Sequence, residues 1–173
     1  MTITEDAKVL HLEENGMPDL PDPHLPEPSD AHRRLEVFVG KWRHRGESYG
    51  DGQRSDDPLA SAVPWTGDES YEWLPGRFFL LHRWDAILGR REFKGTEILG
   101  YDEAEGVHFT RMFDNAGNHP DYRASVDGDV WTFSEATTRA TVTVTDGMNV
   151  AWEWRTKGND WLPLCDRVAT RVE

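Results

Sequence analysis

Most of this chain alternates between apolar and polar residues in short runs that are bounded by turn residues. A period of two places alternate side chains on opposite faces of a β-strand, and Asp-Gly or Pro-Gly between two such runs is typical of a hairpin. The pattern predicts about ten antiparallel strands in up-and-down order. Their ranges are 41–48, 67–74, 78–86, 93–102, 107–113, 122–126, 130–134, 139–145, 148–155 and 161–172.

An open sheet of ten strands exposes two long edges, and closure of the sheet removes both of them. We therefore predict an all-β fold, an antiparallel up-and-down barrel. Before the first strand, residues 31–39 show a short helical pattern, which Ser29 can cap and Gly40 can end. Because Leu35 and Phe38 give this helix an apolar face, we expect it to cap one end of the barrel.

The first 30 residues differ in composition from the rest of the chain. They hold five of the ten prolines and eight acidic residues against a single lysine, Lys8. Such a segment does not form a regular element and tends to polyproline II or disorder. We therefore divide the chain into an acidic, proline-rich arm, residues 1–30, and a barrel domain, residues 31–173. The arm is either a loose tail or a segment that packs on the barrel or on the partner in a homodimer.

Two segments resemble known barrel families. Leu35–Trp42, with the sequence LEVFVGKW, resembles the L-x-x-L-x-G-x-W opening of calycin-type barrels, the group of lipocalins and fatty-acid-binding proteins. Gly95–Asp102, followed by Phe113–Gly117, resembles a bacterial lipocalin-like family of unknown function that is a cousin of the haem-binding nitrobindins. The resemblance covers roughly residues 35 to 172. It implies a barrel with an internal cavity that holds a small, mostly apolar molecule.

Polar residues share strand faces with the aromatic residues, so they point inward if those faces do. The residues that meet this condition are Glu69, His82, Glu97, Arg111 and Asp166. Buried charge is costly unless it is paired, and Glu97 and Arg111 lie on the two strands of one hairpin, so we expect them to form an ion pair. This pair either fixes the strand register or, with His82, orients the polar end of a ligand. The candidate catalytic residues are therefore His82, Glu97 and Arg111.

The chain has eight tryptophans, more than a core of this size requires. Aromatic side chains on inward faces either fill a core or line a cavity suited to a planar ligand. The candidate ligand-binding residues are Tyr71, Trp73, Trp84, Phe109, Trp152 and Trp154. Alternation also predicts which side chains on these strands are exposed, namely Glu72, Arg83, Glu153 and Arg155.

The histidines and the cysteine do not suggest a metal site. The seven histidines show no metal-ligand spacing, and a single cysteine, Cys165, excludes a multi-cysteine zinc site. We expect His44 and His108 to face outward. Nitrobindins bind haem through a histidine late in the chain, whereas the last histidine here is His119. We therefore predict that the protein uses no metal and no cofactor, haem included.

The charge and hydropathy of the chain limit the classes of partner that it is expected to bind. The net charge of −13 and the pI near 4.9 disfavour binding to nucleic acid and to anionic membranes. Mean hydropathy is −0.71, and no apolar run approaches the roughly 20 residues of a spanning helix. Residues 1–6 lack the basic and apolar segments of a secretory signal. We therefore expect a cytoplasmic protein whose partner is a small apolar molecule.

Two functions remain compatible with the sequence. In the first, the barrel binds a small hydrophobic or aromatic molecule in its internal cavity. In the second, the same barrel is an enzyme, a cyclase or isomerase of a polyketide-like or other small apolar substrate. His82, Glu97 and Arg111 would then be the polar groups that steer protons, because a small barrel can enclose a flexible substrate and polarise one carbonyl.

Overall fold

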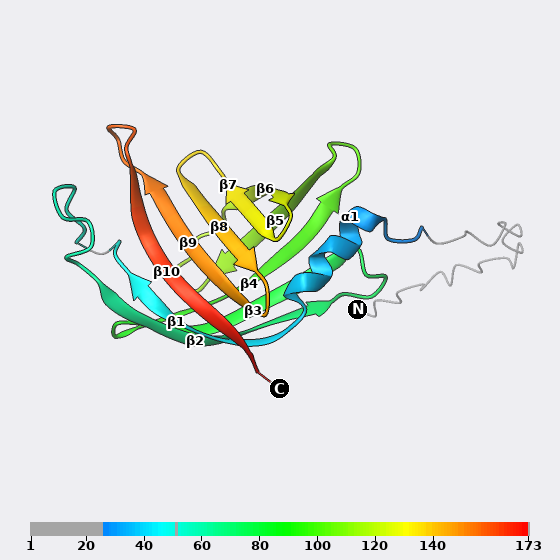
Figure 1. Ribbon diagram of the computed structural model, residues 1–173, viewed down its shortest axis with the longest axis horizontal. Helices are drawn as coiled ribbons and strands as arrows, with labels where there is room; N and C mark the ends of the chain where they lie inside the picture. The colour runs from blue at the N-terminus through cyan, green and yellow to red at the C-terminus, as the bar shows by residue number, and fades with distance from the viewer. Residues whose placement is uncertain (1–25, 51, 173) are drawn as a thin grey trace, which may run out of the picture.

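The computed structural model describes residues 26–50 and 52–172, which form a closed antiparallel barrel of ten strands with a short helix at one end (Figure 1). The helical segment consists of α1 (Asp30–Arg33) and the 3-10 helix η1 (Arg34–Phe38). The strands are β1 (Gly40–Ser48), β2 (Val63–Trp73), β3 (Phe79–Leu88), β4 (Arg91–Asp102), β5 (Val107–Asp114), β6 (Asp121–Asp127), β7 (Val130–Ser134), β8 (Thr138–Val144), β9 (Gly147–Arg155) and β10 (Trp161–Val172).

Every strand pairs with its neighbours in the chain, and β1 closes the ring by pairing with β10 from Lys41↔Val172 to Ser48↔Cys165. Closure leaves no unpaired edge, as the sequence pattern requires. The predicted all-β, up-and-down barrel is confirmed, including its ten strands. Most of the predicted arm, residues 1–25, lies outside the described residues.

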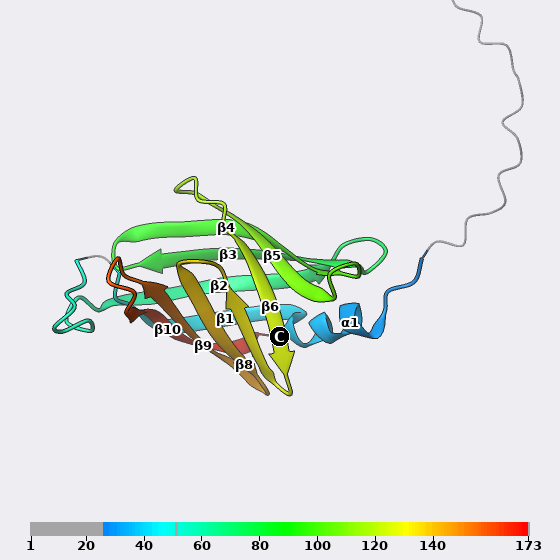
Figure 2. The same cartoon turned by 90° about the horizontal axis from the view of Figure 1, so that it is seen from above.

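The helical segment plugs one end of the barrel, as predicted, and Figure 2 shows it at the end of the strands. Leu35 and Phe38 are buried in the core between the strands. The indole of Trp42 donates a hydrogen bond to the carbonyl of Phe38 at 2.8 Å, which ties the end of η1 to β1. On the other side, His108 Nε2 donates to the carbonyl of Ala31 at 2.9 Å. The helix is therefore held through both its apolar face and its backbone.

The predicted faces of β2, β3, β4 and β9 are correct. Tyr71 and Trp84 are buried, and Trp73, Trp152 and Trp154 are half-buried with their strand faces inward. On the opposite faces the side chains are more open: Glu72, Arg83 and Arg155 are exposed, and Glu153 is half-buried beside Arg139.

The predicted face of β5 is wrong, and with it the predicted Glu97–Arg111 ion pair. The Arg111 side chain is 65% exposed on the outside of the barrel, with its Nε 3.9 Å from Asp121 Oδ1. Phe109 also faces outward, where it packs with Phe79 over Gly100; a Cβ at position 100 would lie 2.7 Å from both rings. Because β5 carries apolar residues on both faces, hydrophobicity did not reveal which face is inside.

The inward residues of β5 are the alternate set, His108, Thr110 and Met112. The expectation that His108 faces outward is therefore wrong as well. His108 is buried between the helical segment and Trp131, whose ring centroid lies 4.9 Å from that of the imidazole. The same correction applies to His44, which is buried inside the barrel.

β10 contains a bulge that also reverses the expected faces. Pro163 pairs with Glu153 and Cys165 pairs with Trp152, so Leu164 is an extra residue without a partner on β9. After this insertion Cys165 is buried and faces the cavity with Arg167, while Asp166 is exposed. The expectation that Asp166 points inward is therefore wrong, because strict alternation does not survive a bulge.

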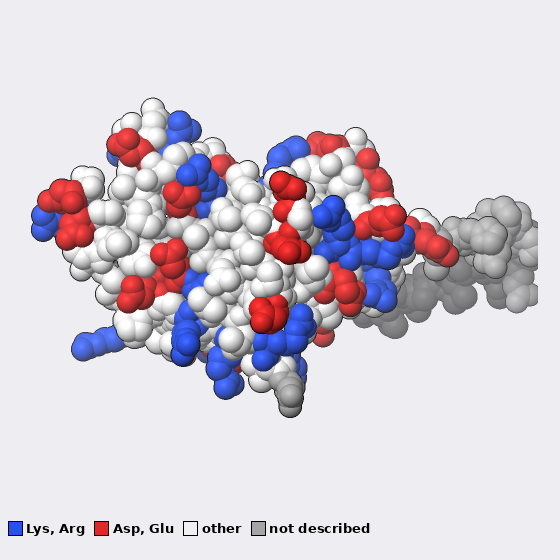
Figure 3. Space-filling model, in the orientation of Figure 1, with Lys and Arg blue, Asp and Glu red and all other residues white. Residues whose placement is uncertain are grey.

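Acidic and basic side chains are interspersed on the face seen in Figure 3, where neither sign forms a continuous patch. Within residues 26–50 and 52–172, no helix is long and apolar enough to cross a membrane.

Candidate functional site

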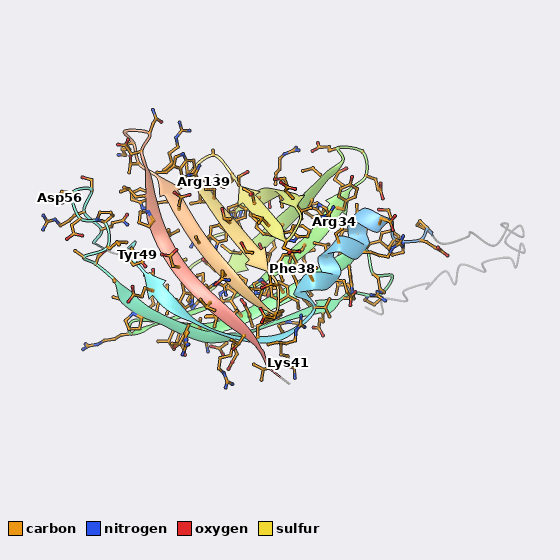
Figure 4. The ribbon with its side chains drawn as sticks, in the orientation of Figure 1. Arg34, Phe38, Lys41, Tyr49, Asp56 and Arg139 are labelled. Atoms are coloured by element: carbon orange, nitrogen blue, oxygen red, sulfur yellow. The ribbon has the colours of Figure 1, made fainter. Side chains whose placement is uncertain are left out.

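The barrel encloses a cavity of about 260 Å³ that extends from Phe38, under the helical segment, to residues at the opposite end of the strands. Figure 4 shows these two ends, with Phe38 at the helix and Tyr49 beyond the end of β1. At the far rim the lining includes Ser48, Leu88 and Arg91. Between the ends, the side chains of the inward strand faces form the walls.

Five of the sequence-predicted site residues line the cavity: Tyr71, His82, Trp84, Glu97 and Trp152. Arg111 and Phe109 lie outside the barrel, as described above.

Trp73 and Trp154 are half-buried but do not belong to the lining. Trp73 lies near the helical segment, where its indole donates to Glu36 Oε2 at 2.7 Å. Trp154 lies near the far end, where its indole donates to Gln53 Oε1 at 2.6 Å. Their indole N–H groups are thus bound to residues of the helical segment and the loop after β1.

His82 lies between two carboxylates. Its Nδ1 is 3.0 Å from Glu97 Oε2, and its Nε2 is 3.2 Å from Glu69 Oε2. An ionised carboxylate only accepts hydrogen bonds, so an imidazole that bonds to carboxylates through both nitrogens is protonated. Burial by itself lowers the pKa of His82, but the two carboxylates outweigh it and raise the pKa above its ordinary value. Tyr71 stacks on this imidazole with ring centroids 3.9 Å apart.

Arg167 lies inside the cavity, away from the rim. Its Nη1 donates to Glu69 Oε2 at 2.7 Å, and the Glu69 side chain has no exposed surface. Burial raises the pKa of Glu69, but the charge of Arg167 and the hydrogen bond from His82 outweigh it and leave this pKa well below its usual range. The carboxylate is therefore ionised and shared by two cationic partners.

His44 completes the polar cluster from β1. Arg167 Nη1 lies 3.1 Å from His44 Nδ1, and because guanidinium only donates, Nδ1 must be the unprotonated acceptor. Burial and the nearby positive charge of Arg167 lower the pKa of His44 to about 4. At neutral pH this imidazole is uncharged and carries its proton on Nε2.

The cavity has two chemically different walls. We call the residues His44, Glu69, His82, Glu97 and Arg167, from β1–β4 and β10, the polar wall. The apolar wall comes from β6–β9 and consists of Tyr122, Phe133, Val142, Met148, Val150 and Trp152. Figure 2 shows β2, β3 and β4 along one side of the barrel and β8 and β9 along the other.

Sequence reasoning placed Glu69, His82 and Glu97 inside but missed His44 and Arg167. A signal for His44 was present, because it shares a strand face with Trp42 while Lys41 and Arg43 occupy the other face. For Arg167 the signal was Pro163, since proline within a strand often marks a bulge.

The histidines and the cysteine of the cavity do not fit the role of a haem ligand. Both nitrogens of His82 bond to carboxylates, and the free nitrogen of His44 carries the proton. Burial raises the pKa of the Cys165 thiol to about 12, so it stays protonated. In the described parts of the chain, no group of three or more histidine, cysteine or acidic side chains is arranged to hold a metal ion.

Comparisons with known proteins identify the family. Residues 27–157 match the family described as "Protein of unknown function (DUF1579)", and the chain belongs to this family. No curated protein matches the sequence. The solved structure of Rv2717c from M. tuberculosis resembles the barrel with a TM-score of 0.63 and 15% identity, covering 85% of this chain and 100% of that one. The zebrafish ileal bile acid-binding protein, complexed with cholic acid, aligns with a TM-score of 0.48 and 13% identity over 79% of this chain and 99% of its own. The chain is thus a ten-stranded antiparallel barrel that belongs to a family of unknown function.

Proposed function

We propose that this DUF1579 barrel binds a small, mostly apolar molecule, about the size of one or two fused rings, in its internal cavity. The observation that carries the proposal is the cavity of about 260 Å³, which combines a continuous apolar wall with a single polar cluster. An apolar cavity of about 150 Å³ is large enough to bind benzene. Convergent polar groups in an otherwise apolar cavity are typical of ligand sites.

The apolar wall supplies the driving force for binding. Phe133, Val142, Met148 and Val150 present side chains that are already withdrawn from water. A ligand that enters transfers its own apolar surface from water to this wall, which contributes roughly 25 cal/mol per Å² of buried surface. The closed sheet keeps the wall in place before the ligand arrives, so little ordering is needed on binding.

The contacts of the polar wall favour binding over proton-transfer catalysis. In a cyclase or isomerase, a general acid or base must reach the proton that it transfers. Here both nitrogens of His82 bond to Glu69 and Glu97, and Glu69 also accepts a hydrogen bond from Arg167. His44 is held neutral, with a pKa of about 4. The cluster is thus better suited to orient a ligand than to move protons.

A matched pair of valine variants tests the proposal. Val150 faces the cavity, whereas Val168 is 47% exposed on the outside of β10. Val150→Phe should fill part of the cavity and abolish binding of a neutral two-ring dye such as 1-naphthylamine, while Val168→Phe should leave its binding unchanged. Native mass spectrometry of protein purified from its own host should likewise show a bound mass in the parent and in Val168→Phe but not in Val150→Phe. Equal dye binding by both variants, or none by the parent, would refute the proposal.

A further inference from the structure

The polar wall and its surroundings contain buried polar atoms that have no hydrogen-bond partner in the described part of the protein. Five of them belong to cavity-lining residues: His44 Nε2, Trp65 Nε1, Glu69 Oε1, Trp84 Nε1 and Arg167 Nε. Indole and guanidinium nitrogens are donors only, and the contact between Arg167 and His44 Nδ1 makes His44 Nε2 a donor too. The set therefore comprises four N–H donors and one acceptor.

The two indoles lie close together in the same part of the cavity. The rings of Trp65 and Trp84 both contact Phe93, with centroid distances of 5.8 Å and 5.6 Å. His44 contacts Trp65 edge-on at 5.7 Å, and His82 lies 5.1 Å from Trp84. Both tryptophans are almost fully buried. The donors are thus carried by side chains that rigid packing already holds, which is how a protein preorganises a site for one kind of group.

The charges of the polar wall are balanced before a ligand binds. Arg167 and the doubly bonded His82 carry two positive charges, and Glu69 and Glu97 carry two negative charges. A buried charge needs a partner, and every charge in this cluster already has one. An anionic ligand in contact with the cluster would add an uncompensated charge, whereas a neutral acceptor would not. The surplus of N–H donors and the absence of surplus charge point to the same ligand chemistry.

We propose that the ligand carries an uncharged carbonyl oxygen, as in a ketone, ester or lactone, which accepts hydrogen bonds from the buried N–H groups of Trp65, Trp84 and His44. The rest of the ligand is apolar and packs on the apolar wall. This inference rests on the proposed binding function and specifies the ligand that the same cavity selects. A hydrocarbon of the same shape would leave these donors without partners, so it binds more weakly.

Three naphthalenes with the same ring skeleton test separately whether the cavity binds apolar molecules and whether it prefers an uncharged carbonyl. 2-Acetylnaphthalene carries the carbonyl, 2-ethylnaphthalene lacks it, and 2-naphthoate replaces it with a carboxylate. Their affinities are measured by quenching of tryptophan fluorescence and by calorimetry. We expect the ketone to bind at least fivefold more tightly than the hydrocarbon, the gain of about one hydrogen bond. The carboxylate should bind more weakly than the ketone.

Tryptophan variants locate the carbonyl. Trp65→Phe and Trp84→Phe remove one N–H each, and Trp152→Phe is the matched control, since Trp152 lines the same cavity but its N–H is not one of the four unpartnered donors. The ratio of ketone to hydrocarbon affinity should fall severalfold in Trp65→Phe, Trp84→Phe or both, and stay unchanged in Trp152→Phe. The ratio cancels any change of cavity shape. The infrared carbonyl stretch of the bound ketone should lie below its value in an apolar solvent and move back toward that value in the same variants.

Each outcome decides one claim. If none of the three compounds binds, the binding function itself fails. If ketone and hydrocarbon bind equally, the cavity binds apolar molecules and the carbonyl inference is wrong. If the naphthoate binds most tightly, the cavity selects an anion, with Arg91 at the rim or Arg167 inside as its partner, and the inference of a neutral acceptor is overturned.

Discussion

The two walls of the cavity obey opposite energetic rules. The apolar wall consists of side chains for which burial is favourable, and each of them contributes independently through the surface that it withdraws from water. The polar wall consists of groups for which burial is costly, and they persist only because Glu69, His82, Glu97 and Arg167 satisfy one another. One wall is a sum of separate contributions, and the other is a network.

This difference assigns the two walls different tasks in binding. The apolar wall tolerates exchange of one aliphatic side chain for another of similar volume, so it sets how much ligand the cavity holds. The polar wall tolerates little change, because loss of one member leaves another buried and unpaired. It therefore sets which end of the ligand faces which side. Variants that break the network should be far more damaging than variants of the apolar wall.

The largest effect should follow from breaking the network at Arg167. Arg167→Met leaves Glu69 buried with His82 as its remaining cationic partner, and we expect a loss of about 3–5 kcal/mol in the free energy of unfolding, as for other buried pairs broken from one side. The double variant with Glu69→Gln should recover much of that loss. Chemical denaturation of the parent, both single variants and the double variant measures the coupling.

Arg111→Met is the matched control for this experiment. The Arg111 side chain is exposed and paired only loosely with Asp121, so its replacement should change stability by less than about 0.5 kcal/mol. If Arg111→Met is as destabilising as Arg167→Met, the assignment of the cavity arginine is wrong.

The second largest effect should come from acid, which lowers the stability of the folded protein by protonating the polar wall. The pKa of His44 is about 4 in the folded protein and 6.5 in the unfolded chain, so the unfolded chain binds more protons between these values. Stability should therefore fall as the pH decreases from about 6.5 to 4, by about 3 kcal/mol from this residue. Protonation of Glu69, whose pKa is also lowered, adds to the loss at still lower pH.

His82 has the opposite sign, since its raised pKa contributes stability below pH 6.5 that is lost as the pH rises through the folded value. Unfolding curves recorded across the pH range should thus show maximal stability near neutrality. His44→Asn should flatten the acid limb, and the exposed His119→Asn should not. An acid limb that is identical in all three proteins would contradict the role of His44.

A smaller effect is expected from the apolar wall. Met148 is almost fully buried and lines the cavity, and Met148→Ala should cost about 2 kcal/mol, the low end for such a truncation, because one side of the residue already borders the cavity. Val168→Ala on the outer surface should cost less than about 0.5 kcal/mol. Thermal or chemical unfolding compares the two. A loss for Met148→Ala as large as that for Arg167→Met would erase the distinction between the walls.

We expect that haem does not bind in the cavity. The imidazoles of the polar wall offer no free lone pair. Both nitrogens of His82 bond to carboxylates, His44 Nδ1 accepts a hydrogen bond from Arg167, and His44 Nε2 carries the proton. Haem iron requires an axial ligand. Titration of haem should therefore give no stoichiometric shift of the Soret band. A tight shift that is lost in His82→Ala or His44→Ala would show that the network opens to ligate iron.

The sequence predicted the barrel well because closure, hairpin turns and alternation all depend on local patterns. The same alternation correctly predicted that four side chains point inward, those of Glu69, His82, Trp84 and Glu97. It failed on β5, where apolar residues occupy both faces, and the residues inside include His108 and Thr110, which are polar. Period alone specifies which residues share a face, and it does not specify which face is inside.

A local sequence pattern could not predict which charged residues pair inside the barrel. Arg167 meets Glu69 across the ring closure of β1 with β10, a contact between residues 98 positions apart in the chain. Glu97 and Arg111, in contrast, lie on the two strands of one hairpin and carry opposite charges, so they made the more obvious pair. Proximity in a hairpin is a poor guide to pairing when the two side chains point to opposite faces of the sheet.

The extra residue in β10 has a consequence for how this protein is compared with its relatives. Leu162 and Cys165 lie across from Trp154 and Trp152, so removal of any one residue between Pro163 and Asp166 would give a regular strand and still leave Arg167 opposite Val150. Strand β10 can therefore lose one residue at the bulge and keep its pairing with β9 on both sides. A relative with one residue fewer here would keep its arginine at the same place in space while an alignment without a gap shifts it by one position. Equivalent arginines in such proteins are best identified by their partner on β9 rather than by counting along the chain.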